Sequence, residues 1–196
     1  REEYTEKASD GTTPLYVYHF KEPEPHYNGA WSETKPVILV VSGVHPTEQS
    51  GVWSMYYAME EITNNKKLLD IRRNLHIIVM PMINPTGFTD STYGVRNPNG
   101  IQVHYNFEVD FKYPTDSGYV AHGQRNHGGE TPLSIPETQY FASIMEEYKD
   151  NLACVLSCHN NDVDTQWGTG FVWSSCATHF MCNLGFRLVD KLSAAW

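Results

Sequence analysis

The sequence predicts an α/β protein in which helices pack on a mixed, largely parallel twisted sheet. Three short apolar runs have the length of buried strands, and helical spacing of apolar residues occurs between them. Alternation of strands and helices is typical of a layered α/β sandwich. With 196 residues, 40% hydrophobic and 19% charged, the chain has a globular composition and enough length for a sizeable core. We expect a single domain over residues 1–196.

The first half of the chain supplies strand candidates and one helix. A strand is expected at residues 15–20, and the run 37–41 is continuously apolar, as in a strand covered on both faces. Apolar residues then recur at helical spacing over 52–62, which predicts a helix of about three turns. Residues 75–80 predict the next buried strand, and a turn at 84–87 ends it.

The second half begins with an excursion and ends in regular elements. Residues 88–130 are rich in Gly, Asn, Asp, Pro and Tyr, and an irregular stretch of this length usually lines a site or is disordered. Ser134 and Glu137 then have the spacing of a capping box that starts a helix. A third buried strand is expected at 152–158, and residues 177–192 repeat at helical spacing.

Composition narrows the classes of partner. The net charge of −9 argues against nucleic acid, because phosphate binding needs a basic face. No apolar stretch approaches ~18 residues, so membrane insertion is not expected. The four cysteines lack a CxxC pair, which argues against a four-thiolate zinc site and favours buried free thiols.

Candidate metal ligands follow two of the predicted strands. His45 and Glu48 come just after 37–41, and His159 comes directly after 152–158. Ligands of α/β sheets bind beyond the carboxyl ends of strands, so these three side chains are expected to meet. Two His and one Glu bind zinc while leaving one position open for water. The alternative is a loop histidine, a helix-start glutamate and a strand-end histidine with ordinary structural partners.

These residues belong to five motifs whose order resembles that of the zinc metallocarboxypeptidases of the funnelin type. The family pattern is Gly-x-His-x-x-Glu, Asn-Pro-Asp/x-Gly, Gly-Val-Asp-Leu-Asn-Arg-Asn-Phe, Ser-Glu-Pro-Glu-Thr and an apolar strand ending in His. The matching segments here are 43–48, 84–87, 100–107, 134–138 and 156–159.

The resemblance implies a three-layer sandwich around an eight-stranded mixed sheet and a metallopeptidase activity. It implies Zn²⁺ held by His45, Glu48 and His159, and hydrolysis of a peptide or amide bond by metal-activated water, with peptidoglycan-type peptides as one candidate substrate. The strand at 16–20 is also similar to that of members attached to phage tails and bacterial surface proteins. That likeness favours an extracellular, virion or surface location over a cytoplasmic one, and a larger assembly as partner.

The substrate-binding motif departs from the family pattern. His104 and Tyr105 stand where the family has the Asn-Arg that binds the substrate's terminal carboxylate. A phenol cannot grip a carboxylate bidentately as a guanidinium does, so removal of a free C-terminal residue is not implied. His104, Tyr105 and Asn160 are the substrate-binding candidates, and Arg125 is a candidate replacement for the missing guanidinium.

Two catalytic groups also depart from the pattern. The family's oxyanion-stabilising arginine aligns with Val95, and Arg96, one residue away, is the candidate; a solvated loop arginine is the alternative. The family's general base is a glutamate well downstream of the third ligand, and none of residues 160–196 is Glu. We therefore expect the general base to lie outside this chain, which would be the N-terminal and central part of a longer domain; a pseudoenzyme is the alternative.

Two other functions remain open from the sequence. An N-acyl-amino-acid hydrolase of the desuccinylase or aspartoacylase type has a similar ligand pattern but favours His-Gly-x-Glu, whereas Pro46-Thr47 follow His45 here. A non-catalytic binding module that retains the fold would account for the altered residues 104 and 105.

Overall fold

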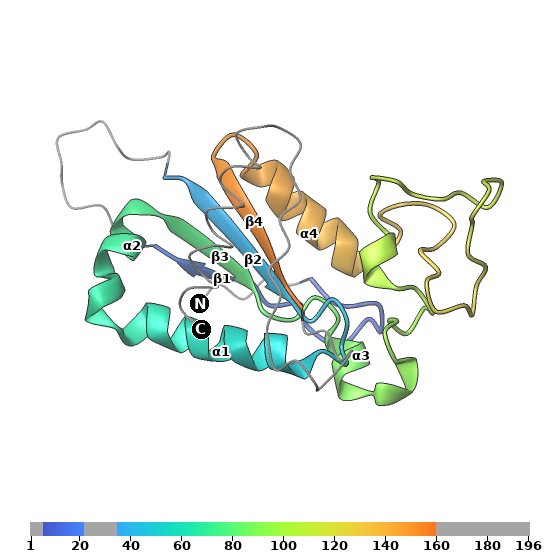
Figure 1. Ribbon diagram of the computed structural model, residues 1–196, viewed down its shortest axis with the longest axis horizontal. Coiled ribbons are helices and arrows are strands. Elements are labelled where there is room, and N and C mark those ends of the chain that lie inside the picture. The colour runs from blue at the N-terminus through green and yellow to red at the C-terminus, as the bar shows by residue number, and fades with distance from the viewer. Residues whose placement is uncertain (1–5, 22–34, 160–196) are drawn as a thin grey trace, which may run out of the picture. The chain divides into compact units, whose positions relative to one another are not determined.

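The computed structural model describes residues 6–21 and 35–159, and its centre is a sheet of order β1-β3-β2-β4 (Figure 1). Strand β2 (Val37–Ser42) runs parallel to both β3 (His76–Met80) and β4 (Leu152–Cys158). Strand β1 (Tyr18–Phe20) pairs antiparallel with β3. The predicted mixed, largely parallel sheet is therefore confirmed for the part of the chain that the structure describes.

Helices cover both faces of the sheet, as Figure 1 shows. Alternate side chains of a strand point to opposite faces, so one apolar run can fill two cores. One core joins the sheet to α4 (Pro136–Glu147) and includes Leu39, Val41, Ile78, Met80, Tyr140, Phe141 and Ile144. The other joins it to α1 (Gln49–Asn64) and includes Val40, Ile77, Val79 and Met55, with Met59 and Ile62 packed against them. These two cores give the three layers that were expected.

Helix α1 begins immediately after the residue that was predicted to bind metal. Glu48 occupies its N-cap position but makes no side-chain cap hydrogen bond, so its carboxylate is directed elsewhere. The negative charge is still favourable there, because the amino end of a helix carries a partial positive charge. A Cβ added at Gly51 would lie 3.2 Å from the carbonyl oxygen of Cys158, so the first turn of α1 packs closely on the end of β4.

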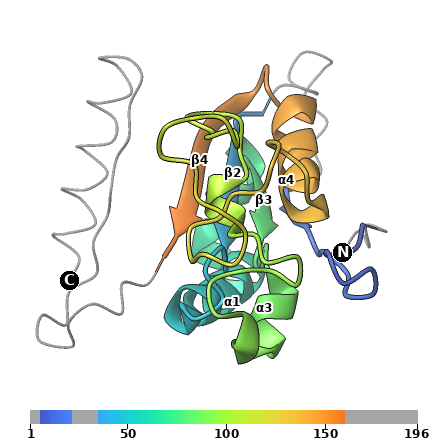
Figure 2. The ribbon, with the colours of Figure 1, turned by 90° about the vertical axis from the view of Figure 1, so that its right-hand side faces the viewer.

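The excursion at residues 88–130 is largely irregular, as predicted, and lies between the viewer and the strands in Figure 2. The predicted turn at 84–87 is instead the start of a short helix. Asn84 caps it, since its Oδ1 accepts a hydrogen bond of 3.1 Å from the backbone N–H of Gly87. The remaining short elements are η1 (Lys66–Leu68), α2 (Leu69–Asn74), α3 (Pro85–Thr89), η2 (Ser91–Tyr93) and η3 (Val103–Tyr105).

Three other details of the sequence-based prediction are wrong. Only Tyr18–Phe20 of the expected strand 15–20 pairs in the sheet, although Leu15 and Val17 are buried. The expected capping box does not form, because Ile135 takes the N-cap position and the Glu137 carboxylate accepts hydrogen bonds from the N–H and hydroxyl of Ser9, at 2.9 and 2.6 Å. Finally, β4 is an edge strand of the described sheet and alternates between partly buried and exposed side chains.

Asn160 and the helix expected at 177–192 lie outside the described residues. Within residues 6–21 and 35–159, none of the helices has the length and apolar character needed to cross a membrane.

Candidate metal centre

The candidate ligands come from two loops that leave neighbouring parallel strands. Ser42 and Cys158, the last residues of β2 and β4, are partners in the sheet register, so both strands end at the same level. After β2 the chain turns at Gly43, whose φ is +66°. A Cβ added there would lie 3.3 Å from Cα of Met82, so both the backbone conformation and the packing favour glycine. This turn places His45 and Glu48 beside His159, as the sequence predicted.

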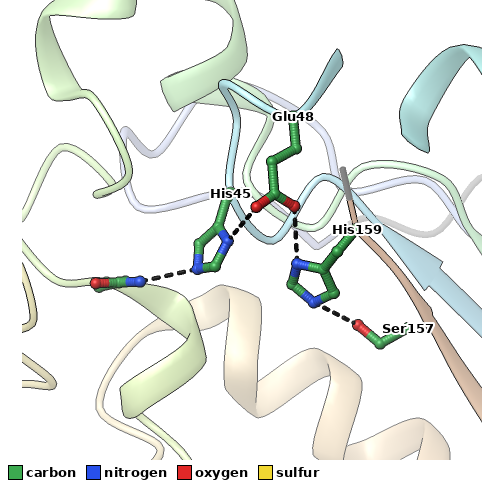
Figure 3. Close-up of polar contacts among 5 residues, drawn as sticks. His45, Glu48, Ser157 and His159 are labelled. Carbon is green, nitrogen blue, oxygen red and sulfur yellow. Dashed lines mark hydrogen bonds and ion pairs between the residues drawn. The ribbon is translucent and has the colours of Figure 1, made fainter. Parts of the chain in front are cut away.

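Glu48 lies between the two histidines (Figure 3). Its Oε1 is 2.8 Å from Nδ1 of His45, and its Oε2 is 2.8 Å from Nδ1 of His159. The ligand atoms of the three residues lie within 4.8 Å of one another. Side-chain exposure is 17% for His45, 16% for Glu48 and 33% for His159, so the cluster is partly sheltered yet reachable from solvent.

This donor set fits zinc. Two imidazole nitrogens and one carboxylate oxygen form the set that catalytic zinc sites use when a fourth position is left for water or substrate. The Nδ1 atoms of both histidines face the carboxylate, so the donor atoms of the three side chains converge. Because the imidazoles must present a bare nitrogen to the metal, binding would replace these hydrogen bonds by metal–ligand bonds.

The outer nitrogen of each histidine has a partner that sequence reasoning missed. Nε2 of His45 lies 2.8 Å from Nε2 of Gln102, and Nε2 of His159 lies 3.0 Å from the Ser157 hydroxyl. Ligating histidines normally hold their second nitrogen in such contacts, which orient the ring. Gln102 could have been singled out from the sequence, because it stands at the Asp position of the Gly-Val-Asp segment of the family pattern.

His104 packs directly on the candidate ligands. Its ring is stacked on His45 with a centroid separation of 5.5 Å and an interplanar angle of 8°, and its centroid is 6.0 Å from that of His159. Burial lowers the pKa of His104, and the neighbouring His45 and His159 lower it further, although Glu48 acts in the opposite direction. These effects favour the neutral imidazole, and His104 presents an aromatic ring where the family pattern has an amide.

Tyr105 is more exposed than a residue that binds substrate inside a closed pocket. Its side chain is 45% exposed, and its ring lies 5.2 Å from the His104 ring, centroid to centroid. Its carbonyl oxygen would be only 2.4 Å from a Cβ added at Gly128, so the chain needs glycine at that close approach. The Tyr105 ring thus extends the aromatic surface of His104.

Arg96 lies next to the loop that carries His45. A Cβ added at Gly87 would lie 2.8 Å from both the carbonyl oxygen of Arg96 and Cγ of Pro46, so these two residues approach each other closely. The Arg96 guanidinium donates a hydrogen bond of 2.8 Å to the carbonyl of Gly123, and Arg96 and Arg125 line one shallow cavity of about 370 Å³. Its backbone is thus close to the candidate centre, while its side chain is turned towards the 123–125 loop.

Asn106 holds the loop that carries Gln102 and His104 against the start of α4. It is fully buried. Its Nδ2 donates to the Gly128 carbonyl, the Thr131 carbonyl and the Ser134 hydroxyl, at 2.6, 3.1 and 2.8 Å. Its Oδ1 accepts from Ser134 N and from the Thr138 hydroxyl, at 3.0 and 2.7 Å. A single side chain therefore fixes one wall of the centre.

Comparisons with known proteins agree with this fold. A family model described as zinc carboxypeptidase matches residues 8–169. Carboxypeptidase O of Homo sapiens is 27% identical over 205 residues, covering 94% of this chain and 52% of the relative. Carboxypeptidase O of Bos taurus is 25% identical over 185 residues, covering 82% and 46%. The chain spans about half the length of these curated relatives.

A solved structure gives the same fold. The crystal structure of the carboxypeptidase A from Helicoverpa armigera superposes with a TM-score of 0.67 at 19% identity, over 80% of this chain and 39% of that chain. At this identity the likeness concerns the fold, and it supports the layered, mostly parallel architecture described above.

Proposed function

We propose, from the premise that the chain belongs to the zinc carboxypeptidase family, that it carries the zinc site of a metallopeptidase, a hydrolase that cleaves peptide or amide bonds. One observation carries the proposal: His45, Glu48 and His159 come from loops at the carboxyl ends of two neighbouring parallel strands, and their ligand atoms lie within 4.8 Å of one another. Residues 111 positions apart, Glu48 and His159, are in direct contact there.

The three side chains would hold Zn²⁺ as two nitrogen donors and one oxygen donor. Zinc bound in this way lowers the pKa of a water molecule and polarises a substrate carbonyl. His104 and Tyr105 would form an aromatic wall beside the ligands, favouring an apolar or planar substrate group. Arg96 is the proposed stabiliser of the developing oxyanion, which requires its guanidinium to leave Gly123 and turn towards the centre. The general base is proposed to lie outside this chain.

The zinc site is tested by metal analysis of the chain purified without chelator. We expect about one zinc per chain, and its loss in the His45→Ala and His159→Ala variants, because three protein ligands are needed for a tight site. His122→Ala, at an exposed histidine of the excursion, is the matched control and should keep its zinc. A zinc content well below one, or no change in His45→Ala, refutes the proposal.

The substrate class is tested by the affinity of the zinc-loaded chain for two families of compounds. Dipeptides with a free C-terminus and peptidoglycan stem peptides represent the peptidase, and N-acyl amino acids represent the desuccinylase or aspartoacylase type. Tyr105 in place of arginine does not separate the two types, because compounds of both classes carry a free carboxylate. Tighter binding of N-acyl amino acids would establish the second type, whereas binding of either class without turnover would indicate a binding module.

Arg125 is proposed to replace the missing carboxylate grip. It lines the same cavity as Arg96, so two cationic side chains are available on one side of the Gly123 loop. Arg125→Ala should weaken binding of a C-terminal dipeptide about tenfold, the loss of one charge-assisted contact. Arg73→Ala, at an exposed arginine of α2, is the control. Unchanged affinity in Arg125→Ala removes this role.

A location outside the cytoplasm and a larger assembly are further parts of the proposal, motivated by the resemblance of the N-terminal strand. Fractionation of the native source, with the chain detected by antibody, tests both. Recovery as a monomer from the cytoplasmic fraction would refute them.

A further inference from the structure

The Gln102 side chain is buried beside the metal centre with half of its amide unsatisfied. The residue is 5% exposed, and its Nε2 lies 2.8 Å from Nε2 of His45. Its Oε1 has no hydrogen-bond partner among the residues that the structure describes. Leaving a buried amide oxygen without a partner costs roughly 1–3 kcal/mol of stability. We therefore expect this oxygen to accept a hydrogen bond in the functional form of the centre.

The backbone of Gln102 is fixed, while its amide can turn. The Gln102 N–H donates to the His127 carbonyl at 2.8 Å, and its carbonyl accepts from the N–H of Tyr105 at 3.0 Å. A rotation of about 180° around the last side-chain bond exchanges the amide oxygen and nitrogen without moving this backbone. The residue can therefore present either a donor or an acceptor to the same atom of His45.

Each amide orientation matches one tautomer of His45. When the amide N–H faces the ring, Nε2 of His45 accepts and its Nδ1 carries the proton, which points at Oε1 of Glu48 2.8 Å away. When Oε1 of Gln102 faces the ring, it accepts from Nε2–H, and Nδ1 is left as a bare lone pair on the side of Glu48 and His159. A neutral imidazole has only these two forms, and a metal can bind only the nitrogen without a proton.

We propose that Gln102 is a positioning residue whose Oε1 accepts from Nε2–H of His45 when the centre holds metal, which fixes the tautomer that ligates through Nδ1. The inference rests on the proposed function, since it assumes that zinc binds at this centre. This orientation of the amide also gives Oε1 the hydrogen bond that it lacks in the orientation described above. Ser157, the corresponding partner of His159, needs no such turn because a hydroxyl both donates and accepts.

Zinc affinity measured by competition with a chromophoric chelator tests the role. Gln102→Leu fills the same space without an acceptor and should weaken zinc binding about 10- to 100-fold, the usual loss when the partner of a ligating histidine is removed. Gln102→Glu keeps an acceptor at the same reach and should bind within about threefold of the unsubstituted chain or more tightly. Gln124→Leu, at an exposed position of the excursion, is the control and should be unchanged.

NMR of the unsubstituted zinc-loaded chain, labelled with ¹⁵N-histidine, supplies a readout that does not depend on a variant folding. We expect His45 to carry its proton on Nε2 with slow exchange, and this proton to exchange faster in Gln102→Leu. Coordination through Nε2, or zinc affinity of Gln102→Leu within about twofold of the unsubstituted chain, overturns the inference while leaving the zinc site intact. Failure of the unsubstituted chain to bind zinc overturns both proposals.

Discussion

Replacing Asn106 by Asp should destabilise the chain out of proportion to the size of the change. The two side chains have the same shape, but the carboxylate has no N–H to donate. Three bonds that Nδ2 donates are removed, and a new oxygen faces the carbonyls of Gly128 and Thr131. The Ser134 hydroxyl can turn and donate to that oxygen, so the carbonyls of Gly128 and Thr131 lose their donor. At roughly 1–3 kcal/mol for each of these two groups, we expect a loss of at least about 2 kcal/mol.

Urea unfolding at pH 7, followed by circular dichroism, measures this loss. A fall of this size is a large part of the roughly 5–15 kcal/mol that stabilises a typical domain, and it should lower the midpoint without changing the slope. Asn99→Asp, the same chemical change at an exposed residue nearby, should stay within about 0.5 kcal/mol. If Asn106→Asp is as mild as this control, Asn106 does not hold the wall of the centre and the reasoning is refuted.

Three further predictions concern other parts of the molecule. Gly87→Ala would place a Cβ 2.8 Å from both the Arg96 carbonyl and Cγ of Pro46, so we expect a loss of about 1–3 kcal/mol in thermal unfolding and weaker zinc binding; a neutral effect would contradict this packing. Although partial burial opposes it, hydrogen bonds from Thr13 and Thr12 hold the pKa of Asp10 well below its usual value. A lowered folded-state pKa stabilises the fold above about pH 4, and this stabilisation is lost in acid. The unfolding midpoint of the unsubstituted chain should therefore exceed that of Asp10→Asn by less and less as the pH falls from about 5 to about 2. A difference in midpoint that stays constant over this range would refute the prediction. Burial raises the pKa of the Cys158 thiol, so its alkylation at pH 8, followed by peptide mass spectrometry, should be about tenfold slower in the folded than in the urea-unfolded chain, and equal rates would contradict its burial.

Several features of this protein follow from the sequence because they depend on neighbours along the chain. The apolar runs at 37–41 and 75–80 become β2 and β3 since each strand must fill a core on both faces. The helical spacing over 52–62 becomes α1 for the same reason, through its contact with one of those cores. His45, Glu48 and His159 are also predictable, because the carboxyl ends of parallel strands meet at one edge of a sheet.

Other features were decided by partners far away in the chain. Ser134 and Glu137 have the local pattern of a capping box, yet the Glu137 carboxylate bonds Ser9, which is 128 positions away. Gln102 carries no metal-ligand chemistry of its own, and only the approach of two loops 57 residues apart sets its amide against His45. A buried polar side chain must find a partner wherever the fold offers one, because leaving it unpaired costs more than any local preference provides.

The candidate metal ligands were therefore predictable from the sequence, as donors placed by strand ends. The residues that contact these candidate ligands or form the wall beside them, Gln102, Ser157, His104 and Asn106, were set by tertiary contacts. The physical reason is range: apolar periodicity acts within one element, whereas a hydrogen bond in the interior joins whichever elements the packed layers bring together.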